Sequence, residues 1–302
     1  MDQTLLDGLD AATLGSTLAR FMAAYVNDPA LAAQNHDRVA ELTATLTDVE
    51  LSCLLDALRT VGTEQRLYPA DPAGRRIARR WCEVLLADST TEGLAHLDEA
   101  ARRGPTVVVC NHLSYIDTTA TDLLLAHRGH AALADRLVAV AGPKVYADLF
   151  RRFAAACLNT LPAPQSTQLE GTARLPPREL ARQALQSVAL THEAIESGYI
   201  PLVYPEGSRS RTGHLRPFLK AVHRYLEVDG VSVVPLAITG TNHVFPVDAA
   251  TLNAAPVSLR FGAPVQLGTG RDAREGLIAA HQAIAALLPS DYQPLPDDPA
   301  VV

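Results

Sequence analysis

The sequence of 302 residues lacks the long apolar runs that mark membrane proteins. No stretch reaches the roughly 18 uninterrupted apolar residues that a membrane-spanning helix needs. The first 21 residues have neither a basic start nor a continuous apolar run, so we expect no signal peptide and no anchor there. We therefore expect a cytoplasmic location, with peripheral contact to the inner face of the membrane as the alternative.

Cysteine is scarce and unpaired. The four cysteines show no CxxC pair and no short spacing typical of a zinc site or a disulfide framework, so we expect reduced core residues at Cys53, Cys82, Cys110 and Cys157. The sequence also has no HExxH motif or similar cluster of ligand residues. We therefore predict no metal site.

An excess of basic charge is missing as well. The formal net charge is -7, which disfavours a nucleic-acid-binding protein because neutralising phosphates requires a basic surface. The charge is uneven, however: residues 144–224 contain eleven basic and six acidic side chains. This region suits a ligand that carries phosphate, although solvated arginines on helix surfaces would give the same count.

Hydrophobic residues make up 48% of the chain, enough for a sizeable core. In residues 1–103 they recur at helical spacing, as in Leu51, Leu54, Leu55 and Leu58, which predicts an N-terminal bundle of helices. After residue 103, short β-branched runs alternate with helical stretches. This alternation predicts an α/β domain over residues 104–288, with a mostly parallel central sheet flanked by helices.

The expected strands cover residues 106–110, 137–141, 200–204, 231–238 and 257–261. The expected helices between and after them cover residues 116–126, 145–157, 178–197, 218–226 and 273–288. The remaining residues, 289–302, form a tail rich in proline and aspartate that we expect to be poorly ordered.

The segment NHLSYID follows the first expected strand directly, at the end where parallel sheets place their ligands. His112 can accept a proton near neutral pH, and a carboxylate on its other ring nitrogen would orient it. Asp117 is the nearest candidate if it lies in the first turn of the following helix. Alternatively, Ser114 and Asp117 have the S-x-x-D spacing of a capping box, which would make the segment structural.

A second polar segment, YPEGSRSR, follows the third strand from Tyr204 to Arg211 and is followed by Lys220. Its arginines could pair with phosphate oxygens through two parallel hydrogen bonds each. It has neither the Walker spacing nor GxGxxG, so a solvated basic turn is the alternative.

Together these segments resemble the family of acyltransferases that acylate glycerol 3-phosphate and lysophosphatidic acid. The family's NHxxxxD block corresponds to Asn111, His112 and Asp117, and its F/Y-P-E-G-T-R-S-R block to residues 204–211, with Ser208 in place of threonine. A strand with a V-P pair corresponds to residues 234–237. The resemblance covers residues 105–240.

The resemblance implies roles for individual residues. His112 would be the general base and Asp117 would orient it, with no covalent acyl-enzyme required. The residues expected to bind substrate are Asn111, Glu206, Gly207, Ser208, Arg209, Arg211 and Lys220, the last three through phosphate. The donor would be acyl-CoA or an acyl carrier protein, acting as a co-substrate, and no other cofactor is expected.

The second block of the family is where this sequence differs, because residues 156–162 contain no arginine. Either Arg151 or Arg152 replaces it, or the acceptor lacks phosphate and is a non-lipid hydroxyl or amine of a small metabolite or a carrier-tethered intermediate. An acidic carrier protein could dock on the arginines of one helix, although a solvated helix face is the alternative; these are Arg75, Arg76, Arg79 and Arg80.

Two other functions are open. A serine hydrolase or thioesterase could use Ser208 or Ser210 with His112 as base, but residues 207–211 lack the second glycine of GxSxG. A lipid- or carrier-binding module without catalysis is the second, and the presence of both His112 and Asp117 argues against it.

Overall fold

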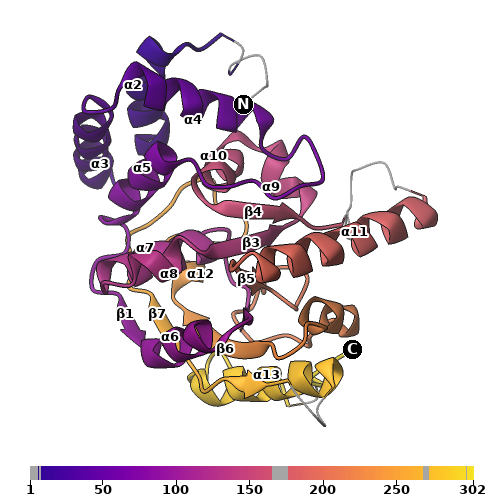
Figure 1. Cartoon of the computed structure of the whole chain (residues 1–302). Coiled ribbons are helices and arrows are strands. Elements are labelled where there is room, and N and C mark those ends of the chain that lie inside the picture. The colour runs from indigo at the N-terminus through magenta and orange to yellow at the C-terminus, as the bar shows by residue number, and fades with distance from the viewer. Residues whose placement is uncertain (1–5, 7, 165–175, 268–271, 297) are drawn as a thin grey trace.

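A computed structural model of the chain describes residues 6, 8–164, 176–267, 272–296 and 298–302 (Figure 1). It contains one eight-stranded sheet in the order β1-β7-β6-β2-β5-β3-β4, with β8 paired to β6. The strands are β1 (Thr90–Glu92), β2 (Thr106–Cys110), β3 (Leu137–Ala141), β4 (Asn159–Pro162), β5 (Ile200–Val203), β6 (Ser232–Thr239), β7 (Ser258–Phe261) and β8 (Val265–Gln266).

Most neighbouring strands run parallel; only the pairs β6–β7 and β6–β8 are antiparallel within the described sheet. All five residues of β2 are buried, because both faces of the sheet are covered. Alternate residues point to opposite faces: Val108 and Cys110 join the core on the side of the N-terminal helices, and Val107 and Val109 join the core under the last helix.

The described helices cover these two faces (Figure 1). They are α2 (Ala11–Ala23), α3 (Pro29–Thr43), α4 (Asp48–Thr60), α5 (Pro72–Cys82), α6 (Leu94–Arg103), α7 (Asp117–His127), α8 (Ala131–Ala134), α9 (Pro143–Ala147), α10 (Leu149–Cys157), α11 (Pro177–Glu196), α12 (Thr241–Val244) and α13 (Ala273–Leu287), with a 3-10 helix η1 (Lys220–Leu226). The expected mostly parallel sheet with flanking helices and an N-terminal helical region is confirmed. The division of the chain at residue 103 stays a prediction.

The N-terminal helices share a hydrophobic core with the sheet. Leu54 of α4 and Ile77 of α5 belong to the same buried cluster as Val234 of β6. The segment before α5 also covers the sheet, because Tyr68 exchanges two backbone hydrogen bonds with Thr160 on the outer strand β4. None of the described helices is both long enough and apolar enough to cross a bilayer.

Three strands were not expected from the sequence. β1 and β8 have only three and two residues, too short to show an alternating pattern. β4 contains Asn159 and Pro162, which strands normally avoid. Asn159 fits because its side chain bonds backbone groups: Oδ1 accepts from Ala70 N at 2.9 Å, and Nδ2 donates to Leu137 O at 2.7 Å.

Several local predictions are wrong. The single helix expected over residues 145–157 is broken between α9 and α10, because Asp148 is extended and its side chain accepts a hydrogen bond from Arg151 N as the N-cap of α10. The helix expected over residues 218–226 is a 3-10 helix that starts at Lys220. Cys53 is exposed, whereas the other three cysteines are buried.

The tail over residues 289–302 was expected to be poorly ordered, and this is also wrong for its described part. Tyr292 is buried, and its backbone oxygen accepts a hydrogen bond from Leu215 N at 2.8 Å. Val301 pairs with Phe218 in an isolated parallel bridge. The tail is ordered because residues 215–220 satisfy its backbone groups, a long-range pairing that composition does not indicate.

The proposed arginine patch on α5 does not exist as a free surface. Arg75 is 8% exposed and, together with Arg79, contacts Asp122 of α7 and Asp135 after α8. The other two pair with acidic side chains, Arg76 with Glu50 and Arg80 with Glu83. Arg75 and Arg79 thus tie α5 to α7 and to the segment after α8. Since all four arginines have acidic partners within the chain, they do not support docking of an acidic carrier protein.

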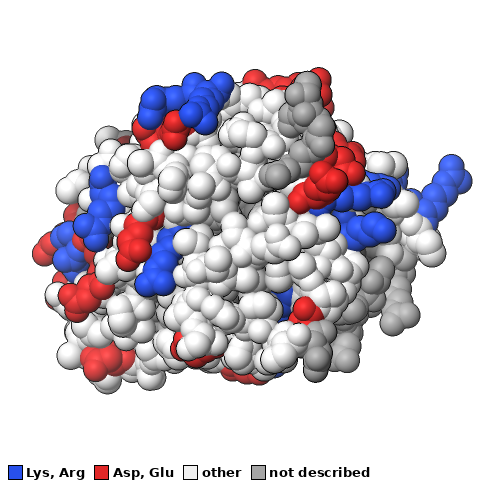
Figure 2. All heavy atoms as spheres, turned by 90° about the horizontal axis from the view of Figure 1, so that it is seen from below, with Lys and Arg blue, Asp and Glu red and all other residues white. Residues whose placement is uncertain are grey.

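On the face of the molecule shown in Figure 2, basic side chains alternate with acidic ones and leave a broad uncharged area between them. They do not form the continuous basic surface that nucleic-acid binding requires.

We predict that Asp122→Ala lowers the free energy of unfolding by about 3–5 kcal/mol, because Arg75 and Arg79 would lose their buried partner. Urea unfolding followed by circular dichroism measures this. The matched control is Asp98→Ala, which breaks an exposed pair with Arg102 on α6 and should cost only about 0.5 kcal/mol. Equal costs for the two variants would contradict the prediction.

Candidate active site

His112 lies in the loop between β2 and α7, and Asp117 is the first residue of α7. The two side chains meet: His112 Nδ1 lies 2.8 Å from Asp117 Oδ2. The side chain of His112 is 17% exposed, whereas that of Asp117 is almost completely buried. With Nδ1 bonded to the carboxylate, Nε2 is the nitrogen left to exchange a proton with a bound molecule.

The carboxylate of Asp117 does not cap a helix in the way that the S-x-x-D pattern suggested. Oδ2 also accepts hydrogen bonds from Leu113 N at 2.9 Å and Ser114 N at 3.0 Å, so it gathers the loop that precedes α7. The N-cap of α7 is Ile116, with no side-chain cap bond. Ser114 Oγ instead donates to Phe245 O at 2.7 Å, across to the segment after α12. The capping-box interpretation is therefore wrong.

The imidazole ring of His112 stacks on Tyr204, which follows β5. The ring centroids are 4.3 Å apart and the planes differ by 28°. The Tyr204 hydroxyl lies 2.9 Å from Thr118 Oγ1, and burial raises the pKa of Tyr204. Stacking on one side and the carboxylate at Nδ1 together hold the ring in one orientation.

The loop after β5 holds the backbone of His112 on both sides. Glu206 Oε1 accepts from His112 N at 2.9 Å, and Ser210 N donates to His112 O at 2.7 Å. Glu206 is 3% exposed, and burial raises its pKa to about 8 against the opposing effects of the His112 N–H and Arg216. Glu206 therefore contacts the loop of residues 111–116, the candidate catalytic loop, directly.

Asn111 faces the sheet. Its side-chain amide donates from Nδ2 to Ile238 O at 2.9 Å and accepts at Oδ1 from Ile238 N at 2.8 Å. The residue is completely buried. Both of its polar groups are thus used to join the end of β2 to β6, which does not favour the expected role in substrate binding.

Arg209 lies over the ring of Tyr115, with its guanidinium carbon 3.7 Å from the ring centroid. Arg151, from α10, places its guanidinium carbon 4.7 Å from the same centroid. Burial lowers the pKa of Arg209, and the charge of Arg151 lowers it further. Two cations thus meet at Tyr115. Asp148 pairs with Arg151. Among the described residues no carboxylate forms an ion pair with Arg209.

The remaining expected residues of the second segment lie differently. Arg211 is exposed and pairs with Asp248 at 2.8 Å, and Lys220 is exposed on η1. Ser208 Oγ accepts from Arg216 at 2.5 Å. Gly207 has a φ of 70°, a backbone conformation that other residues rarely adopt, and a Cβ there would require the side chain of Leu219 to shift. The structure thus brings His112, Asp117, Glu206 and Arg209 together, and turns Arg211 and Lys220 to the surface.

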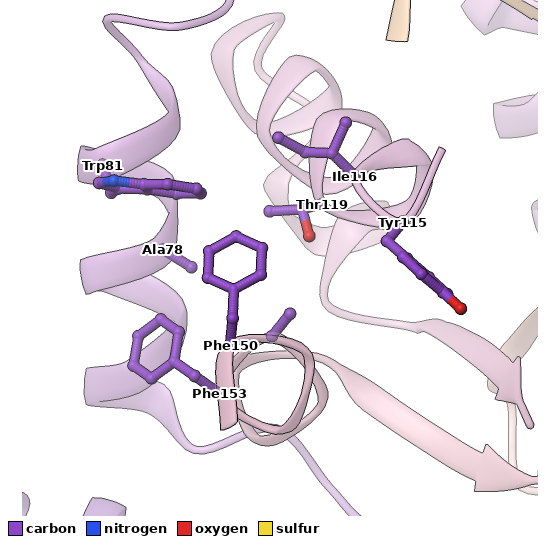
Figure 3. A pocket seen from close by; sticks show the side chains of 8 residues that line it. Ala78, Trp81, Tyr115, Ile116, Thr119, Phe150 and Phe153 are labelled. Carbon is purple, nitrogen blue, oxygen red and sulfur yellow. The ribbon is translucent and has the colours of Figure 1, made fainter. Parts of the chain in front are cut away.

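A small apolar pocket adjoins this site, where α5, α7 and α10 meet (Figure 3). The ring of Tyr115 forms one wall, and its hydroxyl points away from the pocket (Figure 3). The lining side chains are Ala78, Trp81, Tyr115, Ile116, Thr119, Phe150, Phe153 and Ala154. Tyr115 therefore contacts the apolar pocket as well as the two arginines.

No group of three acidic, histidine or cysteine side chains in the described ranges is arranged to hold a metal ion. Sequence reasoning overlooked Tyr115 and Tyr204, although both stand within the two motifs. An aromatic residue gives no chemical signal of its own, and each gains its role only by contact with a residue from another element. Of the two arginines suggested on the helix over 145–157, Arg151 is the one that reaches Tyr115; Arg152 donates to Arg59 O on α4.

We predict that Glu206→Gln changes how stability depends on pH. The pKa of Glu206 is raised from 4.5 to about 8 in the folded chain, so its contribution to stability is full below pH 4.5 and is lost as the pH rises through about 8. Glutamine cannot ionise but can still accept from His112 N. Melting temperatures measured from pH 5 to 9 should therefore fall less for the variant than for the wild type.

The exposed Glu99, which pairs with Arg103 on α6, provides the matched control as Glu99→Gln. Its pH profile should follow that of the wild type. If the Glu206→Gln profile does so too, the inferred rise in the pKa of Glu206 is wrong.

Comparison with known proteins shows similarity over the region that contains these residues. A model of the family described as acyltransferase matches residues 94–239. A 1-acyl-sn-glycerol-3-phosphate acyltransferase from Cocos nucifera is 29% identical over 85 residues, which are 28% of this chain and 27% of that protein. A chloroplastic 1-acyl-sn-glycerol-3-phosphate acyltransferase from Brassica napus is 37% identical over 54 residues, 18% of this chain and 16% of that protein.

The aligned segments thus span only 27% and 16% of the length of these curated relatives. Among solved structures, the 1-acyl-sn-glycerophosphate acyltransferase PlsC from Thermotoga maritima is similar with a TM-score of 0.47 and 16% identity, covering 89% of this chain and 92% of that one. His112, Asp117, Glu206 and Arg209 all lie within the segment that the family model matches. Residues 94–239 of the chain are thus similar to the acyltransferase family.

Proposed function

We propose that this protein transfers an acyl group from a thioester donor to a hydroxyl group of a phosphate-bearing acceptor, of the glycerol phosphate or lysophospholipid type. The observation that carries the proposal is the pair of His112 and Asp117, 2.8 Å apart, in the segment that matches the family model. The curated relatives are named for acylation of 1-acyl-sn-glycerol 3-phosphate, which supports this acceptor class.

In the proposed reaction, His112 Nε2 takes the proton of the acceptor hydroxyl while the hydroxyl oxygen attacks the carbonyl carbon of the thioester. Asp117 stabilises the imidazolium that forms. When the tetrahedral intermediate collapses, the C–S bond breaks and the proton on Nε2 passes to the leaving thiolate. The acceptor ester and the free thiol are the products, and the enzyme returns to its initial state.

The two arginines at Tyr115 support an anionic acceptor. Arg209 is partly buried without an acidic partner among the described residues, and Arg151 adds a second positive charge beside it. A phosphate placed there would supply the missing counter-charge through charge-assisted hydrogen bonds. Arg151 comes from α10 and would thus replace the arginine that residues 156–162 lack.

The apolar pocket supports the donor side of the proposal. It begins at Tyr115, three residues after His112, so an acyl chain in it would keep its carboxyl end near the catalytic loop. Whether acyl-CoA or an acyl carrier protein delivers the chain is tested by offering both. The arginines of α5 are paired within the protein and give no support for the carrier protein.

A non-lipid hydroxyl or amine as acceptor is the second candidate, favoured by the absence of an arginine in residues 156–162. The serine hydrolase has less support. Ser208 Oγ accepts from Arg216, and Ser210 Oγ lies 3.5 Å from Thr212 Oγ1; neither hydroxyl bonds to His112.

We predict that His112→Ala lowers the rate of thiol release by at least about 10²-fold while the protein remains folded, because it removes the general base. Asp117→Asn should lower the rate too, because an amide nitrogen cannot accept the hydrogen bonds that Oδ2 receives. Thiol release from acyl-CoA and acyl carrier protein is measured with glycerol 3-phosphate, with lysophosphatidate and without acceptor. Release that needs no acceptor would indicate a thioesterase, and a folded His112→Ala variant of full activity would refute the mechanism.

We further predict that Arg151→Ala raises the KM for lysophosphatidate about tenfold or more, since a hydrogen bond to a charged group contributes about 1.5–3 kcal/mol. The KM for monoacylglycerol, which lacks the phosphate, should change much less. Arg102→Ala, an exposed arginine on α6, is the matched control. If Arg151→Ala affects both acceptors equally, the arginine does not bind phosphate.

A further inference from the structure

Tyr292 lies beyond the segment that the family model matches, yet it contacts both loops that flank the catalytic loop. Its side chain is 7% exposed and packs in the hydrophobic core under α13. Both its backbone oxygen and its hydroxyl make hydrogen bonds to other elements of the chain. Burial explains why the ring packs in the core. It does not explain which groups the hydroxyl bonds.

The backbone of Tyr292 holds the loop that follows β5. Its carbonyl oxygen accepts from Leu215 N at 2.8 Å. Leu215 is buried and lies further along the same loop as Glu206 and Ser210. Those two residues bond the backbone of His112. One side of Tyr292 is therefore connected to His112 through this loop.

The hydroxyl of Tyr292 holds the segment that follows β6. It donates to Asn242 Oδ1 at 3.0 Å and accepts from Gly240 N at 3.3 Å, both at the start of α12. The exposed His243 lies on the same helix, with Nε2 3.4 Å from this hydroxyl. α12 leads directly to Phe245, whose carbonyl oxygen accepts from Ser114 Oγ in the catalytic loop.

We propose that Tyr292 is a positioning residue for the catalytic loop, which it fixes from two sides through the loop after β5 and through α12. The proposal rests on the proposed acyl transfer for its effect on rate. The bridge holds the segments that grip His112 and Ser114 in one relative position. It does not touch the apolar pocket, so it should affect the chemical step more than donor binding.

The experiment compares Tyr292→Phe with Tyr225→Phe. The first removes the hydroxyl bonds to α12 and keeps the ring and the backbone bond to Leu215. The second removes a partly buried tyrosine hydroxyl of η1 that bonds Ser187 on α11 at 3.1 Å, away from the catalytic loop. Both variants lose a comparable tyrosine hydroxyl, so a general loss of stability should lower both melting temperatures similarly.

In the active protein we expect Tyr292→Phe to lower kcat about tenfold, less than the about 10²-fold that a 1 Å misplacement costs. The KM for the acyl thioester should stay within about twofold of the wild type. Tyr225→Phe should leave both constants unchanged. Equal kcat values for the two variants, whatever their melting temperatures, would overturn the proposal and leave Tyr292 as a packing residue.

Hydrogen–deuterium exchange tests the bridge without activity. Tyr292→Phe should speed exchange in residues 240–245 and also in residues 111–118, whereas Tyr225→Phe should do neither. If the wild type transfers no acyl group, the proposed function fails, but the exchange of residues 111–118 still decides on the bridge. Exchange of that segment at the wild-type rate overturns it.

Asn242→Ala removes the hydrogen bond between the Tyr292 hydroxyl and Asn242 by changing the acceptor, which is partly exposed. This variant replaces Tyr292→Phe in the test if Tyr292→Phe does not fold. The double variant should be no slower than Tyr292→Phe alone, because the bond that Asn242→Ala removes is already lost in Tyr292→Phe. If the two single effects multiply in the double variant, the residues act independently and the bridge is refuted.

Discussion

The geometry of the site depends on one carboxylate oxygen. Asp117 Oδ2 receives hydrogen bonds from the backbone of Leu113 and Ser114 and from His112 Nδ1, and it is buried at the start of α7. A charged oxygen that accepts three bonds stabilises a tight loop that otherwise has no regular structure. The same contacts set the tautomer of His112, so the shape of the loop and the orientation of the imidazole ring both depend on Asp117.

A second carboxyl group lies close by, and the site accommodates it by keeping it mostly protonated. Burial raises the pKa of Glu206 to about 8, and the charge of Asp117 contributes in the same direction. Two ionised carboxylates in this space would repel each other. With Glu206 mostly neutral at pH 7, its oxygen can hold His112 N while Asp117 alone carries the negative charge that an imidazolium needs.

Much of this site could be predicted from the sequence because its motifs are local. The strand that precedes Asn111 is a short β-branched run and the one that precedes Tyr204 is a short apolar run, and their parallel arrangement brings the two motifs to one edge of the sheet. The contacts of Tyr115 with Arg151 could not be predicted, since the two residues lie on different elements. For the same reason the arginines of α5 seemed free, although Asp122, far along the chain, pairs with them. The tail seemed disordered because its partners lie some 75 residues earlier, and only the fold brings Tyr292 to Leu215.

Tyr115 separates two chemically different spaces beside His112. On one side lie the apolar walls formed by α5 and α10, and over its ring lie the guanidinium groups of Arg151 and Arg209. An acyl chain would be stabilised by burial in the first space, and an anion by charge in the second. A donor and an acceptor held in this way would meet at the histidine, which follows from the positions of these groups around a single loop. Phe150 and Arg151 are adjacent on α10, so this short helix contributes to both spaces.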